Sequence, residues 1–305
     1  MAGYVSAVSN HNEFLKENHT LKLKKLPENR KTSQEQRRKP MTNILSKNRS
    51  EVRTILRTID DVQAMRIRTG NRLKKKADGT DQKDANENAP DVTTDSILEN
   101  VDLLDGFESQ EKTLTKVLER VVKQTDEWKK YFKDIKGIGP KMAAIIISEI
   151  DPYKAETVSK MWQYAGLNPG MIFGKKKNAS GEVVATTDLI RGDKKTKGYI
   201  CPYNAYLKTG LCGKIITQLM MAKNERYYGI YLNAKNFYST NPKWKDENKS
   251  HIDMAAKRKV AKIFLQDYYA FVRPLYGLEA RPPYAEEKMG IKHHYYNEEE
   301  RGGSH

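Results

Sequence analysis

The residues best suited to chemistry lie near the middle of the chain, in the stretch 135–151, which reads IKGIGPKMAAIIISEID. Glycines at 137 and 139 permit positive φ angles and let a phosphate come close to the backbone. Pro140 suits the first position of a helix, where no N–H group is needed. The spacing therefore predicts a helix-hairpin-helix turn with a new helix beginning at Pro140.

Such a turn has the features of a phosphate site. The N–H groups of Gly139, Lys141 and Met142 would point at an anion, with the helix dipole behind them. The Lys136 and Lys141 side chains add positive charge. A contact of this kind positions a protein on a nucleic-acid backbone without reading its sequence. The alternative is a plain corner between two packed helices that happens to need two glycines.

A second candidate is the basic segment 174–202, which contains Ser180 next to Gly181 with lysines on both sides. Cationic neighbours would lower the pKa of a serine nucleophile and stabilise the charge that builds up in phosphoryl transfer. An ordinary loop serine is the alternative. The residues expected to contact nucleic acid in the turn and in this segment are Lys136, Gly137, Ile138, Gly139, Lys141, Lys175, Lys176, Lys177, Lys194, Lys195 and Lys197.

We expect neither a metal nor a cofactor. His293 and His294 have no acidic or thiol partner at a ligand spacing, and no set of carboxylates matches what two-metal nuclease chemistry requires. Tyrosines between 199 and 231 could stack on bases, although tyrosines at this spacing also fit half-buried helix packing.

The composition points to a polyanionic partner. The 305 residues include 55 Lys and Arg against 39 Asp and Glu, which gives a net charge of +16. An excess of this size favours nucleic acid, since each neutralised phosphate releases condensed counterions. Two cysteines are too few for a disulfide framework, and no stretch has the pattern of a signal peptide or a membrane helix. We therefore expect a cytoplasmic, nucleoid-associated protein.

The elements that must position these residues are mainly helical. Apolar residues recur at helical spacing over about 50–76 and again from Phe107 to Phe132, which predicts a long antiparallel helical hairpin. Further helices are expected over 140–150, 155–165, 207–219 and 254–268, with a short strand over 182–185. The predicted domains are a disordered basic arm (1–48), the hairpin (49–134, with an acidic loop at 78–95), a helix-hairpin-helix domain (135–275, with the basic loop 174–202) and an irregular tail (276–305).

With these residues identified, the chain resembles the transposases of the insertion-sequence 110/116/902 family. The similarity is carried by IKGIGPKMAAIIISEID followed by SKMWQYAGLNPG, which look like the C-terminal transposase domain, and weaker likeness extends over about 51–296. Gly137, Gly139 and Pro140 match the family's hairpin, and Tyr164 to Leu167 match its signature helix. The resemblance implies DNA recombination guided by a structured RNA, with a catalytic serine in a loop that corresponds to the position of Ser180.

The family's acidic ribonuclease-H-like domain has no counterpart in the basic residues before the hairpin. An active serine recombinase would therefore need those acidic residues in trans. We predict a DNA-binding protein of transposase type, with DNA as its partner and with structured RNA and a second copy of the chain as further candidate partners. The alternative is a non-catalytic protein of a virus or mobile element that packs nucleic acid.

Overall fold

The computed structural model describes the backbone of residues 32–77, 94–244, 247–283 and 290, and within these ranges the side chains of 49–72 and of 102 onward. By its internal contacts the chain divides into two units, 1–48 and 49–305, and the following description concerns the second. The described residues are mainly helical, with one two-stranded sheet, so the predicted fold class is confirmed. None of the described helices is long and apolar enough to cross a membrane.

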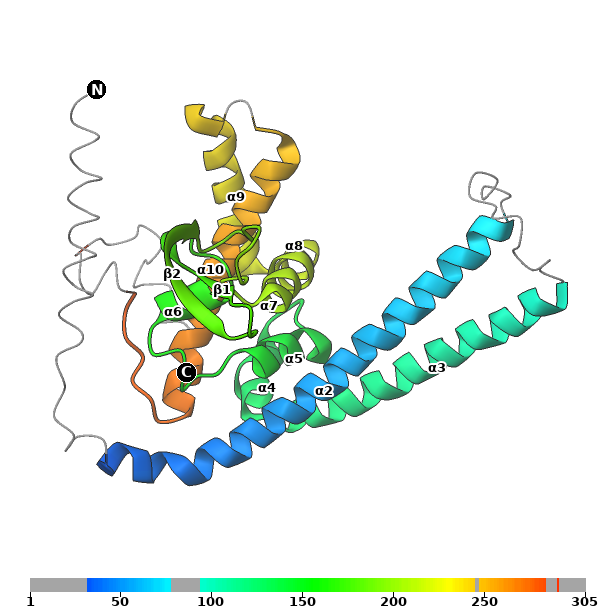
Figure 1. The fold of residues 1–305 in the computed structure, drawn as a ribbon, viewed down its shortest axis with the longest axis horizontal. Coiled ribbons are helices and arrows are strands. Elements are labelled where there is room, and N and C mark those ends of the chain that lie inside the picture. Colours follow the sequence, from blue (N-terminus) through cyan, green and yellow to red (C-terminus); the bar gives the residue numbers. More distant parts are fainter. Residues whose placement is uncertain (1–31, 78–93, 245–246, 284–289, 291–305) are drawn as a thin grey trace. The chain divides into compact units, whose positions relative to one another are not determined.

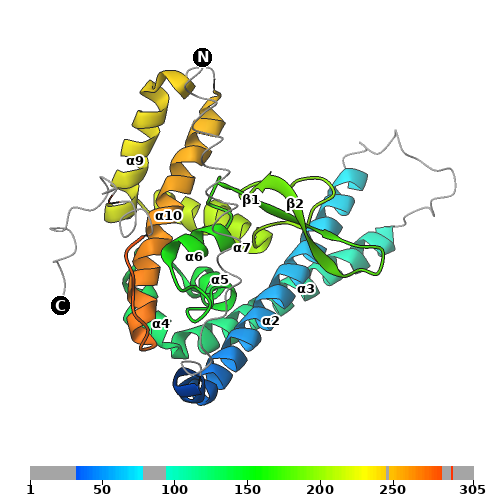
Figure 2. The same cartoon turned by 60° about the vertical axis from the view of Figure 1, so that its left-hand side comes forward.

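The part of α2 (Thr32–Ala77) that belongs to this unit runs side by side with α3 (Thr94–Gln124), in the opposite direction (Figures 1 and 2). Their apolar stripes meet near the helical body, where Val52, Leu56 and Ile59 of α2 and Leu118 and Val122 of α3 are buried. Farther out, Arg66 Nε donates to Glu111 Oε2 at 3.1 Å. This outer part also exposes Met65, Ile67 and Leu103. Dimerisation through the hairpin stays a prediction.

A series of short elements leads from the hairpin to the turn at 137–139. Thr125 ends the long helix, because its hydroxyl accepts the N–H of Trp128 at 3.3 Å and so caps α4 (Asp126–Lys130). A 3-10 turn, η2 (Phe132–Asp134), follows, and then the turn opens into α5 (Pro140–Glu149), as the sequence predicts. The next helix, α6 (Val158–Tyr164), starts later than expected because the side chain of Thr157 caps it.

The basic segment folds as a β-hairpin. β1 (Met171–Lys177) pairs antiparallel with β2 (Val183–Arg191), with Met171 opposite Arg191 and an irregularity between Phe173 and Lys175. The predicted strand at 182–185 is therefore only one end of a longer strand. The run VVATT, at 183–187, has the β-branched residues typical of strands.

The remaining helices close the core. They are α7 (Ala205–Thr209), the π-helix η3 (Gly210–Ile215), α8 (Ile216–Met221), α9 (Glu225–Thr240), the 3-10 turn η4 (Pro242–Trp244) and α10 (Lys249–Leu275). α5 is buried along most of its length, and Phe264 and Tyr268 of α10 pack fully buried in the same cluster as Phe132. The core thus surrounds the helix that the turn introduces.

Some helices begin at other positions than predicted, while the predicted domain division stays a prediction. α2 begins at Thr32, inside the predicted arm of 1–48; the run SQEQRRK, at 33–39, is rich in residues of high helix propensity. α3 begins at Thr94, inside the predicted acidic loop. Residues 1–31 and 78–93, which hold the rest of the predicted arm and loop, lie outside the described residues.

Candidate nucleic-acid interface

The first half of the central turn faces inward. Gly137 has a φ of +97°, and a Cβ at this position would lie 2.9 Å from the Cβ of Ala222 at the end of α8. The next side chain, Ile138, is buried. The fold itself therefore requires glycine at 137, and the buried side chain of Ile138 is not placed to contact a ligand.

The second half of the turn faces outward. Gly139 has φ −91° and ψ 170°, an extended conformation open to any residue, so the positive φ that a glycine permits is not used at 139. The turn needs only one left-handed residue, and Gly137 supplies it. A Cβ at 139 would have no neighbour within 4 Å among the described residues. The described part of the fold therefore does not require glycine there.

The N–H groups at this helix start are fewer than predicted. By their position in α5, the N–H groups of Gly139 and Lys141 have no acceptor inside the helix. The Met142 N–H, by contrast, donates to the Gly139 carbonyl at 3.0 Å, so the prediction of a third free donor is wrong. Two backbone donors thus remain for an anion.

The two predicted lysines of the turn differ. Lys136 is exposed, and its carbonyl accepts a hydrogen bond of 3.0 Å from Asn224 Nδ2, which ties the turn to the start of α9. Lys141 is half-buried, and its Nζ lies 3.9 Å from Glu111 Oε1 of α3. Part of the charge predicted at the turn is therefore balanced by α3.

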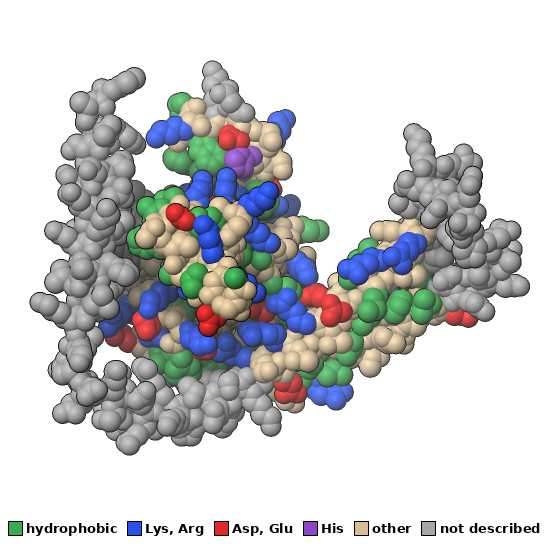
Figure 3. Space-filling model, viewed as in Figure 1, with side chains coloured by type: hydrophobic (Ala, Val, Ile, Leu, Met, Phe, Trp, Pro, Cys, Tyr) green, Lys and Arg blue, Asp and Glu red, His purple; other side chains and the backbone are tan. Residues whose placement is uncertain are grey.

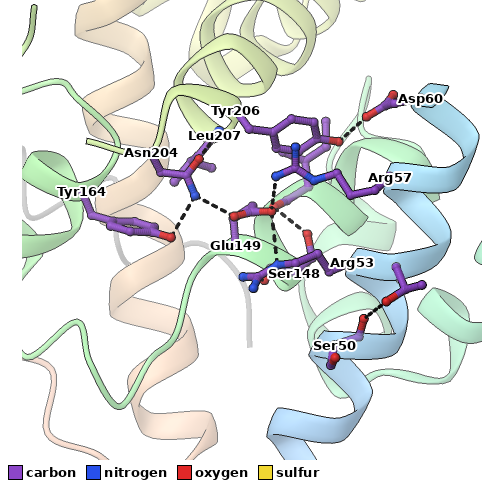
Figure 4. A network of polar contacts seen from close by, with 12 residues as sticks. Ser50, Arg53, Arg57, Asp60, Ser148, Glu149, Tyr164, Asn204, Tyr206 and Leu207 are labelled. Atoms are coloured by element: carbon purple, nitrogen blue, oxygen red, sulfur yellow. Dashed lines mark hydrogen bonds and ion pairs between the residues drawn. The ribbon is translucent and has the colours of Figure 1, made fainter. Parts of the chain in front are cut away.

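A network of polar contacts holds the other end of α5 (Figure 4). The buried Glu149 accepts 2.9 Å and 2.6 Å hydrogen bonds from Arg57 Nη2 and Asn204 Nδ2. Arg53 approaches the same carboxylate at 3.4 Å and donates to the Ser148 carbonyl at 2.7 Å. The network links α5 to α2 and to the start of α7. Together with the packing of Gly137, it fixes α5 at both ends.

Further contacts extend this network toward α6 and α7. Asn204 Nδ2 also donates to the Tyr164 hydroxyl at 2.8 Å, and Asn204 Oδ1 caps α7 by accepting the Leu207 N–H at 3.0 Å. The Arg57 guanidinium stacks 3.2 Å from the centre of the Tyr206 ring, whose hydroxyl donates to Asp60. The signature helix with Tyr164 is thus joined to α5 and α7 through one side chain, Asn204.

The β-hairpin and the loop that follows it form one lysine-bearing unit. The Tyr199 hydroxyl donates to Asp188 Oδ2 at 2.6 Å, and Lys176 Nζ lies 3.2 Å from the same oxygen. The Ile200 N–H donates to the Lys175 carbonyl at 2.7 Å. Hydrogen bonds from Tyr199 and then from Lys176 hold the pKa of Asp188 below its ordinary value. These contacts fasten the loop along β1.

Most of the predicted contact lysines of this unit point to solvent. Lys176 is engaged by Asp188 and lies 4.2 Å from the centre of the Tyr199 ring. The other five are exposed, namely Lys175, Lys177, Lys194, Lys195 and Lys197. In Figure 3, Lys and Arg side chains are spread over the face of the helical body that carries the hairpin. The hairpin unit thus presents positive charge to solvent at these five positions.

Ser180 lies at the exposed tip of the hairpin. Its hydroxyl donates to Asn178 Oδ1 at 2.8 Å, and Glu182 Oε2 lies at 3.4 Å. Gly181 takes a φ of +83°, and Asn178 accepts the Gly181 N–H on its carbonyl and the Glu182 N–H on its side chain. Ser180 is therefore a residue of a tight turn, next to a carboxylate. Its role as a nucleophile stays a prediction.

Sequence reasoning missed Glu149 and Asn204, which join the elements of this region. Asn204 has a local signal, because an asparagine three residues before Leu207 fits a helix N-cap. Glu149 has none, since a single acid after an apolar run gives no sign that two arginines about 90 positions earlier will reach it. Among the side chains that the structure describes, no group of His, Cys, Asp and Glu is placed to hold a metal ion.

Comparison with known proteins shows that the central region is similar to one protein family. Residues 129–203 match the model of the Transposase IS116/IS110/IS902 family, which confirms the resemblance over the turn, α5, α6 and the β-hairpin. The match supports a transposase role in DNA transposition. No curated protein matches the chain. The wider likeness over about 51–296 stays a prediction.

Proposed function

We propose that this chain holds the backbone of a nucleic acid during DNA transposition, through the start of α5 and through the lysines of the β-hairpin unit. The single observation that carries the proposal is Gly139. It is a glycine that neither backbone conformation nor packing requires, at the exposed start of a helix within the transposase-matched region. A ligand that must approach the backbone closely accounts for it.

The start of α5 offers the chemistry that a phosphate needs. The N–H groups of Gly139 and Lys141 are available, and the dipole of a ten-residue helix adds positive potential at this end. Because Gly137 and Glu149 fix the helix at its two ends, these donors are held in place before the ligand arrives. Such preorganisation reduces the ordering that binding would otherwise require.

The β-hairpin unit supplies charge over a longer path. Its five exposed lysines lie on an antiparallel ribbon and its attached loop, a shape suited to lie along a phosphate backbone. Contacts of this kind are made to phosphates and do not read bases. Phosphate contacts also do not discriminate between DNA and RNA. A structured RNA should therefore be tested in the same binding assays.

The test replaces Gly139 with aspartate. Asp is a preferred N-cap residue and its charge suits a helix start, so Gly139→Asp should keep the melting temperature or raise it slightly. The same carboxylate would occupy the open space at 139 and repel a phosphate, so affinity for a DNA duplex should fall about tenfold or more, by the usual strength of charge-assisted contacts.

Ser109→Asp is the matched control, because Ser109 is exposed on α3 and the change in net charge is identical. Fluorescence anisotropy with a labelled duplex at fixed salt measures both variants. If Gly139→Asp folds normally and binds DNA as tightly as Ser109→Asp, the turn is only a corner between helices and the proposal fails for this site.

A further inference from the structure

A cavity of about 430 Å³ lies away from the central turn, between α6, the end of β2 and the α9–α10 pair. Its wall combines three half-buried aromatic side chains with three half-buried cations. The aromatic residues are Trp162, Tyr238 and Trp244, and the cations are Arg258, Lys259 and Lys262. The volume falls within the usual range of small-molecule sites.

The aromatic rings are held in place by the fold. Trp162 Nε1 donates to the Lys262 carbonyl at 2.9 Å, which fixes the indole against α10. Trp244 lies against Tyr238, with ring centres 4.7 Å apart, and against His251 at 5.5 Å. Rigid aromatic surfaces that remain half-exposed are the usual platform for a nucleobase, because every base has a π-face.

Among the described side chains of the cavity wall, cations outnumber acids. Among the described residues of its wall the one acid is Asp193, which is bound by Arg191 through two contacts of 2.9 Å. Within the same described part of the chain, Arg258 and Lys262 form no ion pair with an acid. Burial lowers the pKa of Lys262, so its ammonium would gain stability from an anion brought close to it.

We propose that this cavity binds one nucleotide, with its base on the rings of Trp162 and Trp244 and its phosphate on Arg258 and Lys262. The inference deepens the proposed function, on which it rests for the choice of a nucleic-acid ligand. The shared chemistry is an aromatic base joined to a phosphate. Its source is either an unpaired nucleotide in a bound strand or a free mononucleotide.

The experiment uses the full chain and four probes at one salt concentration, which are dTMP, a short oligo-dT, a blunt duplex and the same duplex with one unpaired thymine. Binding is followed by anisotropy for the labelled DNAs and by quenching of tryptophan fluorescence for dTMP. The variants are Trp244→Leu and Arg258→Gln. Lys243→Gln is the control, since Lys243 is exposed next to Trp244 and does not line the cavity.

If the cavity binds an unpaired nucleotide of a DNA strand, the wild type and Lys243→Gln should bind oligo-dT and the duplex with one unpaired thymine more tightly than the blunt duplex. Trp244→Leu and Arg258→Gln should each weaken binding about tenfold on those two probes only, by the usual value of one stacking or charge-assisted contact. For a free mononucleotide, dTMP should quench the wild type, and both variants should abolish the quenching without a preference for the unpaired base.

The cavity proposal is overturned if Arg258→Gln binds all four probes as Lys243→Gln does. Circular dichroism melting would reveal whether Trp244→Leu folds. If it does not, Arg258→Gln alone still tests the cavity proposal. Failure of the proposed function looks different, because the wild type would then bind no duplex while dTMP still reported on the cavity. Gly139→Asp should weaken binding of both duplexes alike and leave the quenching by dTMP unchanged, so it tests the turn separately from the cavity.

Discussion

At the scale of single residues, the two glycines of the turn have separate tasks. Gly137 is in left-handed conformation and packs against Ala222, so its role is to bring the turn onto α8. Gly139 has no neighbour among the described residues where a side chain would be. A sequence motif treats the two alike, whereas in the structure the described part of the fold requires glycine only at 137.

Glu149 gives a prediction at the same scale. Glu149→Gln removes the negative charge that Arg53 and Arg57 share, but it keeps a side chain of similar shape beside Asn204. We expect a decrease of about 2 kcal/mol in the free energy of unfolding, since the carboxylate is buried while both arginines are more than a third exposed to screening solvent. Thermal melting would show this as a drop of several degrees.

Glu111→Gln is the matched control for Glu149→Gln. Glu111 also pairs with two cations, Arg66 and Lys141, but its contact with Lys141 is long at 3.9 Å and it lies on the outer part of α3. Glu111→Gln should therefore lower the free energy of unfolding clearly less than Glu149→Gln does. Equal melting temperatures for the two variants would mean that the network around Glu149 does not fix α5.

At the scale of elements, the attachment of the 192–200 loop to the β-hairpin should depend on pH. The pKa of the Asp188 carboxyl is lowered by the hydroxyl of Tyr199 and by Lys176. Because the pKa is lowered, the ionised carboxylate stabilises the attachment of the loop fully at any pH above the ordinary aspartate pKa, which is about 4. This stabilisation is lost as the pH falls through the pKa that Asp188 has in the folded protein. The loop should therefore loosen from β1 in acid, and the protein should keep it attached at neutral pH.

Asp188→Asn tests this attachment at neutral pH. The variant should speed hydrogen exchange of the Ile200 amide, which donates to the Lys175 carbonyl, and it should leave the amides of α5 unchanged. Asp102→Asn, at an exposed position of α3, is the control. Unchanged exchange at Ile200 in the Asp188 variant would contradict the idea that Asp188 fastens the loop.

The elements also show what the sequence could predict. The start of α5 was predictable because Gly139 and Pro140 have strong local preferences, and the apolar run after them has a helical period. β1 was not, because its GKKK run looks like a loop, and the pairing that makes it a strand depends on the valines and threonines of β2. The cavity was not predictable either, because it joins residues about 100 positions apart, such as Trp162 and Lys262.

At the scale of the whole molecule, a net charge of +16 leaves two accounts of nucleic-acid binding. In one, charge spread over the surface packs nucleic acid with no defined site. In the other, the lysines of the β-hairpin unit make defined phosphate contacts. The two differ in how affinity depends on salt when equal numbers of lysines are removed from different places.

The comparison is between two triple variants of equal charge. Lys175→Gln, Lys177→Gln and Lys195→Gln change the hairpin unit, and Lys112→Gln, Lys116→Gln and Lys123→Gln change exposed lysines of α3. If the hairpin lysines bind phosphates, the slope of log K against log salt should fall by about 0.9 for each phosphate that is no longer neutralised, close to 3 for the first variant. The α3 variant should keep nearly the wild-type slope. Equal slopes for the two variants would favour charge-driven packing, because a surface without a defined site responds only to net charge.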